Sequence, residues 1–281
     1  MKRDIRLIAL DLDGTLFNSK GMITKHTKEM IQKAGQAGIT VIISTGRPYI
    51  GLPLDDAVEL GIKYAITANG AGIYQIPSKK CLFEDAIAPE AGAELLKELY
   101  QHKLHLDAFI GGNAYTQSST RDFITKLTIS DSMRTYIRDS RTVVDDLAAY
   151  VVEHQLGIQK LTLNFTPDED GNYTERDNIV TLLANFPHLH YVSGGFHNLE
   201  ITKKGITKGE ALRFLCKHLN IPVEQSMACG DSENDLAIVT ASGLGVAMAN
   251  SEQLLLDHAE FVTLSNDEDG VAYAIEELVQ F

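Results

Sequence analysis

Short apolar runs alternate with helical patterns along the first part of the chain. The apolar runs are Ile5 to Leu10, Ile39 to Ile43 and Tyr64 to Ala68. Between the first two runs, apolar positions recur with helical spacing from Thr24, a good N-cap residue, to Gly38, a residue type that ends helices. Short apolar strands joined by helices are typical of βαβ units, so the pattern predicts a parallel sheet.

The same alternation returns near the C-terminus, whereas residues 84–187 differ. There, strands such as Leu161 to Phe165 alternate with a period of two, and polar turns occur at 111–113 and 167–172. We therefore predict an α/β fold, in which a Rossmann-like parallel-sheet core of residues 1–84 and 188–281 carries an inserted α+β module of residues 85–187. The predicted C-terminal elements are a helix Lys208 to Leu219, a strand Ser226 to Cys229, a helix Leu236 to Ala241, a strand Leu244 to Ala247 and a final helix ending at Val279.

Length and composition indicate a globular chain of about two domains. The chain has 281 residues, of which 44% are hydrophobic and 22% charged, and a domain commonly has roughly 150 residues. Lys and Arg number 25 against 38 Asp and Glu, so the formal net charge is −13. This balance argues against a nucleic-acid partner, because nucleic-acid affinity depends on clustered cations. An anionic substrate would need a metal ion or a few well-placed cations in its site.

Neither a membrane nor an oxidising compartment is indicated. The apolar run ending at Leu10 is interrupted by Arg6, so it is too short for a signal peptide or a membrane span. The three cysteines are far apart and form no CxxC pair, which predicts reduced thiols. We therefore expect a cytoplasmic protein with no membrane partner.

The sharpest chemical feature is the segment DLDGT, Asp11 to Thr15, directly after the first predicted strand. Residues two apart on a strand point to one face, so Asp11 and Asp13 can reach one point while Leu12 faces the core. In open α/β sheets, ligands lie beyond the carboxyl ends of the strands. Two acids there repel each other unless a cation lies between them or one is protonated. Taken alone, the pair is also compatible with a solvated acidic turn.

A second acidic run, GDSEND at Gly230 to Asp235, again follows an apolar strand, and the two runs could converge at one sheet edge. Neither run fits an EF-hand loop, which needs glycine at its sixth position and glutamate at its twelfth. Oxygen ligands in this arrangement favour a hard cation, and we expect Mg²⁺. Zinc would require His or Cys ligands, and the nine histidines form no HExxH motif.

Two further segments could hold a phosphoryl group. The segment STGR, Ser44 to Arg47, offers hydroxyls and a backbone turn at the same edge, with an ordinary helix cap before Pro48 as the alternative. The basic residues Lys203, Lys204 and Lys208 stand out in so acidic a chain. One lysine beside a metal would offset charge on a transferring phosphate, while a solvated helix start is the alternative for at least one of them.

The chain has no P-loop, no GxSxG elbow and no complete dinucleotide fingerprint.

These segments, in this order, resemble the haloacid dehalogenase (HAD) superfamily, specifically its Cof-type (subfamily IIB) sugar-phosphatase-like hydrolases. The resemblance spans nearly the whole chain. It implies a HAD fold for the core and an inserted cap that closes over the site, excludes water and selects the substrate. It also rests on three other signatures: Asn69-Gly70-Ala71, Gly245 to Met248 (GVAM) and Asn266 to Ala272 (NDEDGVA).

Carried over position by position, the resemblance implies catalytic roles. Asp11 would be the nucleophile, and Asp13 the general acid and base. Thr45 would bind the phosphoryl group, which Lys208 would steady. Lys208 is preferred to the other two lysines because the family's lysine precedes a glycine that opens a helix, here Gly209.

The resemblance also implies the metal ligands. Asp231 would bind Mg²⁺ opposite Asp11, with the Asp13 carbonyl as another ligand and with Asn234 and Asp235 supporting the site.

On the substrate side, Ser44 stands where the family often has alanine, so both Ser44 and Thr45 stay open as the main phosphate contact. Gly46 and Arg47 would border the substrate, together with Lys208.

The expected activity is Mg²⁺-dependent hydrolysis of a small phosphorylated metabolite, with sugar phosphates implied by the resemblance, through an aspartyl-phosphate on Asp11. A carboxylate that attacks phosphorus divides hydrolysis into two easier steps. Two other functions stay open. A phosphomutase or phosphotransferase would pass the phosphate to a second hydroxyl, and release of free phosphate separates the two cases. A phosphorylatable regulator or metabolite-binding module needs no general acid, so Asp13 argues against it.

Overall fold

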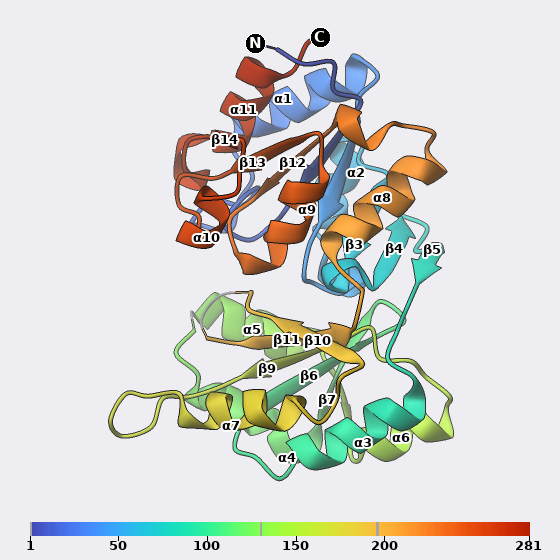
Figure 1. The fold of residues 1–281 in the computed structure, drawn as a ribbon, viewed down its shortest axis with the longest axis vertical. Coiled ribbons are helices and arrows are strands. Elements are labelled where there is room, and N and C mark those ends of the chain that lie inside the picture. The colour runs from blue at the N-terminus through green and yellow to red at the C-terminus, as the bar shows by residue number, and fades with distance from the viewer. Residues whose placement is uncertain (1, 130, 195–196) are drawn as a thin grey trace. The chain divides into compact units, whose positions relative to one another are not determined.

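The computed structural model describes residues 2–129, 131–194 and 197–281 (Figure 1). The chain forms two compact units, each with its own sheet. The first unit contains residues up to 46, 52–83 and 207–281, and the second contains residues 47–51 and 84–206. In the described part of the chain, no helix is long and apolar enough to cross a membrane.

The first unit is built on a mostly parallel sheet. Its order is β14-β13-β12-β1-β2-β3-β4-β5, with parallel pairing from β14 to β3 and antiparallel pairing of β3 with β4. Strand β1 therefore lies in the middle, between β12 and β2, and all its residues are buried. The predicted fold class is confirmed. The strands are β1 (Leu7–Leu10), β2 (Thr40–Ser44), β3 (Tyr64–Thr67), β4 (Gly72–Gln75), β5 (Cys81–Glu84), β12 (Ser226–Gly230), β13 (Leu244–Ala247) and β14 (Phe261–Val262).

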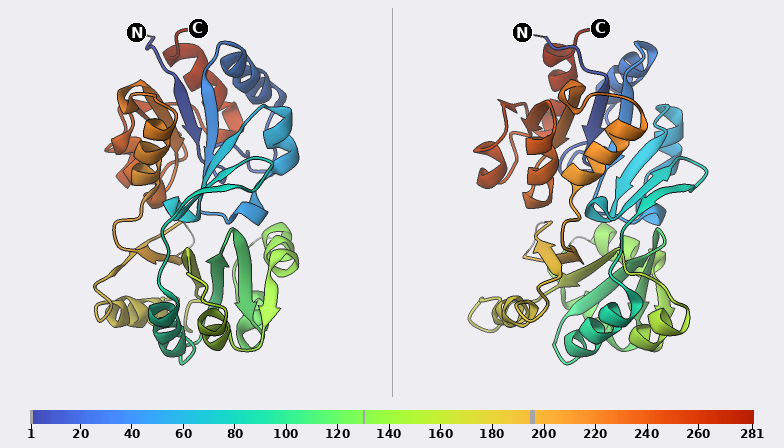
Figure 2. Two further views of the ribbon diagram at one scale, coloured as in Figure 1. Left: turned by 90° about the vertical axis from the view of Figure 1, so that its right-hand side faces the viewer. Right: turned by 45° about the vertical axis from the view of Figure 1, so that its right-hand side comes forward.

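Helices cover both faces of this sheet. Helix α1 begins after the predicted N-cap Thr24, whose hydroxyl accepts a hydrogen bond from Thr27 N at 3.2 Å. Helices α8 and α9 pack with β1, β2 and β12 in one apolar core, and α1 and α11 lie together on the other side of the sheet (Figure 2). The helices are α1 (Lys25–Gln36), α2 (Leu54–Glu59), α8 (Lys208–His218), α9 (Leu236–Ala241), α10 (Gln253–Leu256) and α11 (Gly270–Leu278).

The second unit is a mixed α+β module. Its sheet has the order β10-β11-β9-β6-β7-β8, antiparallel except for the parallel pair β7 and β8. Helices α3, α6 and α7 share one apolar core with β6, β9 and β11. The elements are α3 (Pro89–Leu99), β6 (His105–Ile110), β7 (Asn113–Gln117), α4 (Ser118–Arg121), α5 (Asp131–Ser140), β8 (Thr142–Val144), α6 (Leu147–Glu153), β9 (Lys160–Asn164), α7 (Thr174–Leu183), β10 (Leu189–Val192) and β11 (Leu199–Lys203).

The inserted module is longer than predicted. The sequence pattern placed its end at residue 187, whereas the second unit continues to Ile206. The reason is that β10 and β11 pair with each other and with β9, so they complete the sheet of the second unit. Residues 47–51 also belong to this unit, and Ile50 N donates to Gly112 O at 2.9 Å.

Candidate active site

The two acidic runs meet at the carboxyl edge of the central strands. Leu10 of β1 is in register with Cys229 of β12 on one side and with Ile43 of β2 on the other. Asp11 follows β1 directly, and its backbone N–H donates to Cys229 O at 3.1 Å. Because parallel strands end at the same edge, the segments DLDGT, STGR and GDSEND come together there.

Lys208 joins the two acidic runs. Its ammonium donates to Asp11 Oδ1 at 2.7 Å, to Asp235 Oδ1 at 2.6 Å and to Asn234 Oδ1 at 3.3 Å. Lys208 and Asp235 are fully buried, and Asp11 is 6% exposed. Lys203 lies elsewhere, in the second unit, where it pairs with Asp85 at 2.6 Å.

The Lys208 position follows from local structure. Thr207 caps α8, its hydroxyl accepting from Glu210 N at 3.1 Å, which places Lys208 in the first helical turn. Gly209 packs directly on the backbone of Ala237 in α9, where a side chain would clash. The two helices therefore approach closely, and the lysine is fixed over the acidic cluster.

Burial dominates the electrostatics of this cluster. It raises the pKa of Asp11 well above the usual value, the charges of Asp235 and Asp231 raise it further, and Lys208 opposes them. Burial alone would lower the pKa of Lys208, but the charges of Asp11 and Asp235 outweigh it and raise that pKa above its usual value. An ammonium between two buried carboxylates compensates only part of their negative charge.

Asp231 faces the turn that follows Asp11. Its Oδ1 accepts a hydrogen bond from Thr15 Oγ1 at 3.0 Å. Burial, followed by the charge of Asp235, raises the pKa of Asp231 to about 7. Gly14 has a φ of +80°, and a Cβ at this position would clash with the Asp231 carboxylate. Glycine thus permits both the turn and the close approach of Asp231 to it.

The cluster fits a hard divalent cation. Asp11, Asp231 and Asp235 each offer a carboxylate oxygen, and these oxygens lie within 4.8 Å of one another. Oxygen donors alone favour Mg²⁺ or a similar ion. Burial, and after it the charge of Asp235, raises the pKa of Asp11 and of Asp231, and a bound cation would oppose both effects by stabilising the ionised carboxylates. Both oxygens of Asp235 already accept hydrogen bonds: one from Lys208, and the other from the N–H groups of Asp231 at 3.1 Å and Ser232 at 3.3 Å. Asp11 and Asp231 are therefore the better ligands, with Asp235 orienting the residues around them.

The remaining predicted residues take different positions. Asp13 lies on the turn after β1, and its side chain is exposed. Ser44 and Thr45 are both buried at the end of β2. In the described part of the chain, Ser44 Oγ has no hydrogen-bond partner. Gly46 is the last residue of its segment in the first unit, whereas Arg47 belongs to the second, where its guanidinium donates to Gly51 O at 3.2 Å.

Two residues without a predicted role also belong to the site. Thr15 holds Asp231, as described above. Asn69 has a φ of 57° and accepts a hydrogen bond from Asn234 Nδ2 at 3.4 Å. The Asn-Gly pair at 69–70 was a visible signal, because this dipeptide is typical of turns with positive φ.

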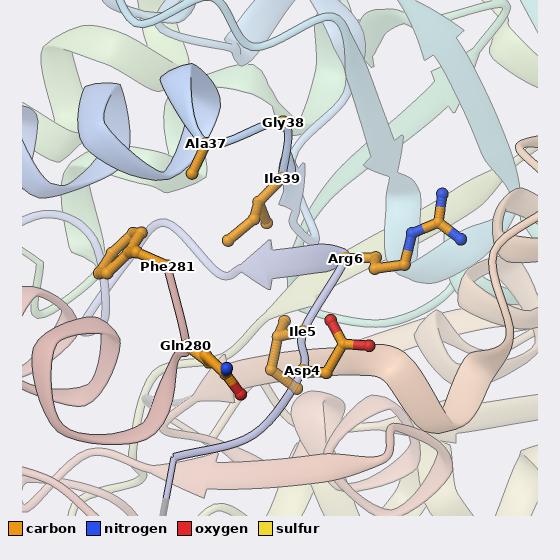
Figure 3. Close-up of a pocket in the computed structure, with 8 residues that line it drawn as sticks. All are labelled: Asp4, Ile5, Arg6, Ala37, Gly38, Ile39, Gln280 and Phe281. Carbon is orange, nitrogen blue, oxygen red and sulfur yellow. The ribbon is translucent and has the colours of Figure 1, made fainter.

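A pocket of the first unit lies away from this cluster (Figure 3). It is lined by residues 4–6, 37–39, 280 and 281. Residues 4–6 and 37–39 precede β1 and β2, so they lie at the opposite edge of the sheet from Asp11. This pocket therefore takes no part in the acidic site.

The fold and the site together define an α/β enzyme core with an acidic cluster at the carboxyl edge of its central strands. The chain belongs to the haloacid dehalogenase-like hydrolases, whose family model matches residues 8–275. The predicted family and the predicted enzyme class, a phosphoric monoester hydrolase of the HAD type, are confirmed.

Named relatives match 98% of the chain. Phosphatase YwpJ of Bacillus subtilis (strain 168) is 32% identical, over 98% of this chain and 100% of the relative. The 5-amino-6-(5-phospho-D-ribitylamino)uracil phosphatase YcsE of the same organism is 28% identical, over 98% of this chain and 96% of the relative. The solved structure of a haloacid dehalogenase-like hydrolase from B. subtilis superposes with a TM-score of 0.84 at 28% identity, covering 98% of this chain and all of that one.

Proposed function

We propose that this protein is a Mg²⁺-dependent phosphatase of small phosphorylated metabolites and that it works through an aspartyl-phosphate on Asp11. The observation that carries the proposal is the placement of Asp11, a buried carboxylate at the carboxyl edge of the sheet, with Lys208 bonded to it at 2.7 Å and Asp231 close by. The second unit is the proposed substrate-selecting cap.

In the first step, an oxygen of Asp11 forms a bond to phosphorus while the bond from phosphorus to the ester oxygen breaks. Asp13 donates a proton to the leaving oxygen, which departs as an alcohol. Lys208 fixes the attacking carboxylate and offsets negative charge on the phosphoryl oxygens. Thr45, buried at the end of β2, donates its hydroxyl to one of those oxygens.

In the second step, Asp13 takes a proton from a water molecule. The water oxygen bonds to phosphorus, the bond from phosphorus to Asp11 breaks, and inorganic phosphate leaves. Asp13 is again protonated, so one residue serves as acid and then as base. Its exposed position on a turn suits this exchange, because both the leaving alcohol and the water must reach it.

Asp11, Asp231 and the backbone carbonyl of Asp13 are the proposed ligands of Mg²⁺, with Asn234 and Asp235 supporting the arrangement. When bound, the ion supplies positive charge that offsets the charges of the phosphoryl group and of the carboxylate that approaches it.

Sugar phosphates and related polyol phosphates are the proposed substrates. The resemblance to Cof-type hydrolases supports this class, and the name of the relative YcsE describes a substrate whose phosphate is carried on a ribityl chain. A panel of hexose and pentose phosphates, ribitol phosphate, 5-amino-6-(5-phospho-D-ribitylamino)uracil and p-nitrophenyl phosphate therefore covers the proposed range.

The test is release of inorganic phosphate from this panel, with Mg²⁺ and with EDTA, by the wild type and by Asp11→Asn. The substitution keeps the shape and removes the nucleophilic carboxylate. Asp4→Asn is a matched control, because Asp4 is an exposed acid in the same unit that accepts a hydrogen bond from Gln225 Nε2 at 2.6 Å. We expect Mg²⁺-dependent release that Asp11→Asn abolishes and Asp4→Asn preserves. Transfer of phosphate to a second sugar without release would instead indicate a phosphotransferase, and equal activity in EDTA would exclude the metal.

A further inference from the structure

Two loops from the C-terminal part of the first unit hold the turn that carries Asp13. One loop, residues 248–252, joins β13 to α10, and the other, residues 263–269, joins β14 to α11. The second loop contains most of the NDEDGVA signature, which the proposed chemistry does not use. Two of its polar side chains, Asn266 and Asp267, point to a role other than solvation, because they bond to backbone groups far away in the sequence.

Asn250 bonds to the residue directly after Asp13. Its Nδ2 donates to Gly14 O at 2.8 Å, and its Oδ1 accepts from Asn266 N at 2.9 Å. Both partners are backbone groups with fixed donor and acceptor character, so they also determine the orientation of the Asn250 amide. A carboxylate at this position would place an acceptor against the Gly14 carbonyl.

The second loop holds the far end of the same turn. Asn266 Nδ2 donates to Phe17 O at 2.8 Å, and Asp267 Oδ1 accepts from Ser19 N at 2.8 Å. Phe17 in turn forms a backbone bridge with Asp13. The backbone around Asp13 is therefore fixed on both sides, at Gly14 by Asn250 and at Phe17 by Asn266.

The first loop also contacts the other half of the site. Met248 N donates to Gly230 O at 3.1 Å, and Glu252 N donates to Asp231 O at 2.9 Å. Ser251 Oγ donates to Gly230 O at 3.2 Å. One short loop thus connects the Asp231 segment to the turn that carries Asp13.

We propose that Asn250 and Asn266 are positioning residues that hold Asp13 in place for proton transfer to the leaving group. This inference rests on the proposed function, in which Asp13 is the general acid. Proton transfer requires the acid within hydrogen-bond reach of the departing oxygen, and Asp13 is the exposed residue of a turn in which Leu12 and Thr15 are buried. The two asparagines hold the backbone on either side of this exposed residue, at Gly14 and at Phe17.

The experiment compares two substrates that differ in their need for an acid. An alkyl phosphate releases a strongly basic alkoxide and needs protonation, whereas p-nitrophenyl phosphate releases a weakly basic phenolate and needs it far less. We expect Asn250→Asp and Asn266→Ala to lower the single-turnover rate of alcohol release from the alkyl phosphate at least tenfold, and that of p-nitrophenol release less than threefold, with little change in KM. The single-turnover rate reports the first step alone, whereas the second step, in which Asp13 acts as the base, is the same for both substrates. A general loss of structure would lower both rates together.

Three controls complete the design. Asp13→Asn provides the full selective loss for comparison. Gln253→Ala should behave like the wild type, because Gln253 is an exposed residue of α10 whose side chain donates to Asp257 Oδ1 at 2.7 Å. Asn250→Ser keeps a small donor and gives a second measurement if Asn250→Asp folds poorly, as judged from the thermal midpoint.

The outcomes separate the inference from the function on which it rests. If Asp13→Asn lowers both rates equally, Asp13 is not the general acid and the proposed mechanism fails. If Asp13→Asn shows the selective loss and the asparagine variants lower both rates equally or neither, the inference alone is overturned.

Discussion

Lys208→Met tests whether Lys208 compensates buried negative charge. The lysine is fully buried and donates to Asp11 and Asp235 at 2.7 and 2.6 Å. Methionine preserves much of the apolar stem but removes the charge. Removing one partner of a buried ion pair costs about 3–5 kcal/mol, because the other partner is left uncompensated. At about 2–4 °C per kcal/mol for a chain of this size, the thermal midpoint should fall by about 6–20 °C.

The loss should depend on pH in a defined direction. The pKa of Asp11 is already raised by burial and by Asp235, and removal of Lys208 raises it further because an attractive charge disappears. When the pKa of a group is higher in the folded than in the unfolded state, the group stabilises the folded state at low pH. This stabilising contribution is complete below the unfolded pKa, about 3.9 for Asp, and it is lost as the pH rises through the folded pKa. The deficit of Lys208→Met relative to the wild type should therefore be small in acid and grow toward neutral and alkaline pH.

The assay is thermal or urea unfolding of both proteins from about pH 5 to pH 8 in EDTA, which removes any bound cation. Lys203→Met is the matched control, because Lys203 forms a partly exposed pair with Asp85. Such pairs contribute up to about 1 kcal/mol. A deficit for Lys208→Met no larger than that of Lys203→Met, or one that shrinks as the pH rises, would refute the reasoning.

Three further predictions concern the site. Gly14→Ala places a Cβ against the Asp231 carboxylate at a φ of +80°, a conformation that costs about 1–2 kcal/mol; we expect weaker Mg²⁺ binding in a calorimetric titration, and unchanged binding would contradict the proposed ligand set. Thr45→Val should lower kcat/KM about 10- to 100-fold, as expected for the loss of one hydrogen bond to a charged group. Ser44→Ala should alter kcat/KM and the thermal midpoint little, because Ser44 Oγ has no partner among the described residues. The reverse ranking would assign the phosphate contact to Ser44. Burial raises the pKa of Asp231 to about 7, so the contribution of Asp231 to the stability of the metal-free protein should fall as the pH rises through that value. Mg²⁺ should therefore raise the thermal midpoint more above that pH than below it. An equal rise of the thermal midpoint on both sides would contradict this prediction.

Local patterns predicted the core of the fold because its strands are short, buried and parallel. Such strands appear in a sequence as apolar runs, and the run Ile39 to Ile43 corresponds to β2, Thr40–Ser44. Patterns failed at the end of the inserted module. Strand β11, Leu199–Lys203, alternates like many strands, and only its pairing with β9 assigns it to the second unit. The residues around β11 in the sequence do not indicate that it pairs with the distant strand β9.

For the site, the sequence indicated which segments converge but not which contacts their individual side chains make. Convergence follows from topology, because segments at the carboxyl ends of neighbouring parallel strands meet. The contributions of Thr15, Asn69 and Asn250 were not predicted, since short polar residues in loops are common and usually solvated. Their roles depend on hydrogen bonds to residues far away in the chain.

The segment GDSEND shows why side-chain contacts could not be predicted from the sequence. Its aspartates look equivalent in the sequence but take different positions in the fold. A short 3₁₀ turn follows Ser232, and the side chains of Ser232 and Asp235 cap each other's backbone N–H groups. This reciprocal cap turns Asp235 back under the loop, against Gly230, where any Cβ would clash with it. Asp235 is thereby buried and bonded to Lys208, while Asp231 is left facing Gly14 with its carboxylate directed toward the Asp11 segment. The glycine at the start of the run and the serine within it therefore decide which aspartate is buried against Lys208 and which one faces the Asp11 segment.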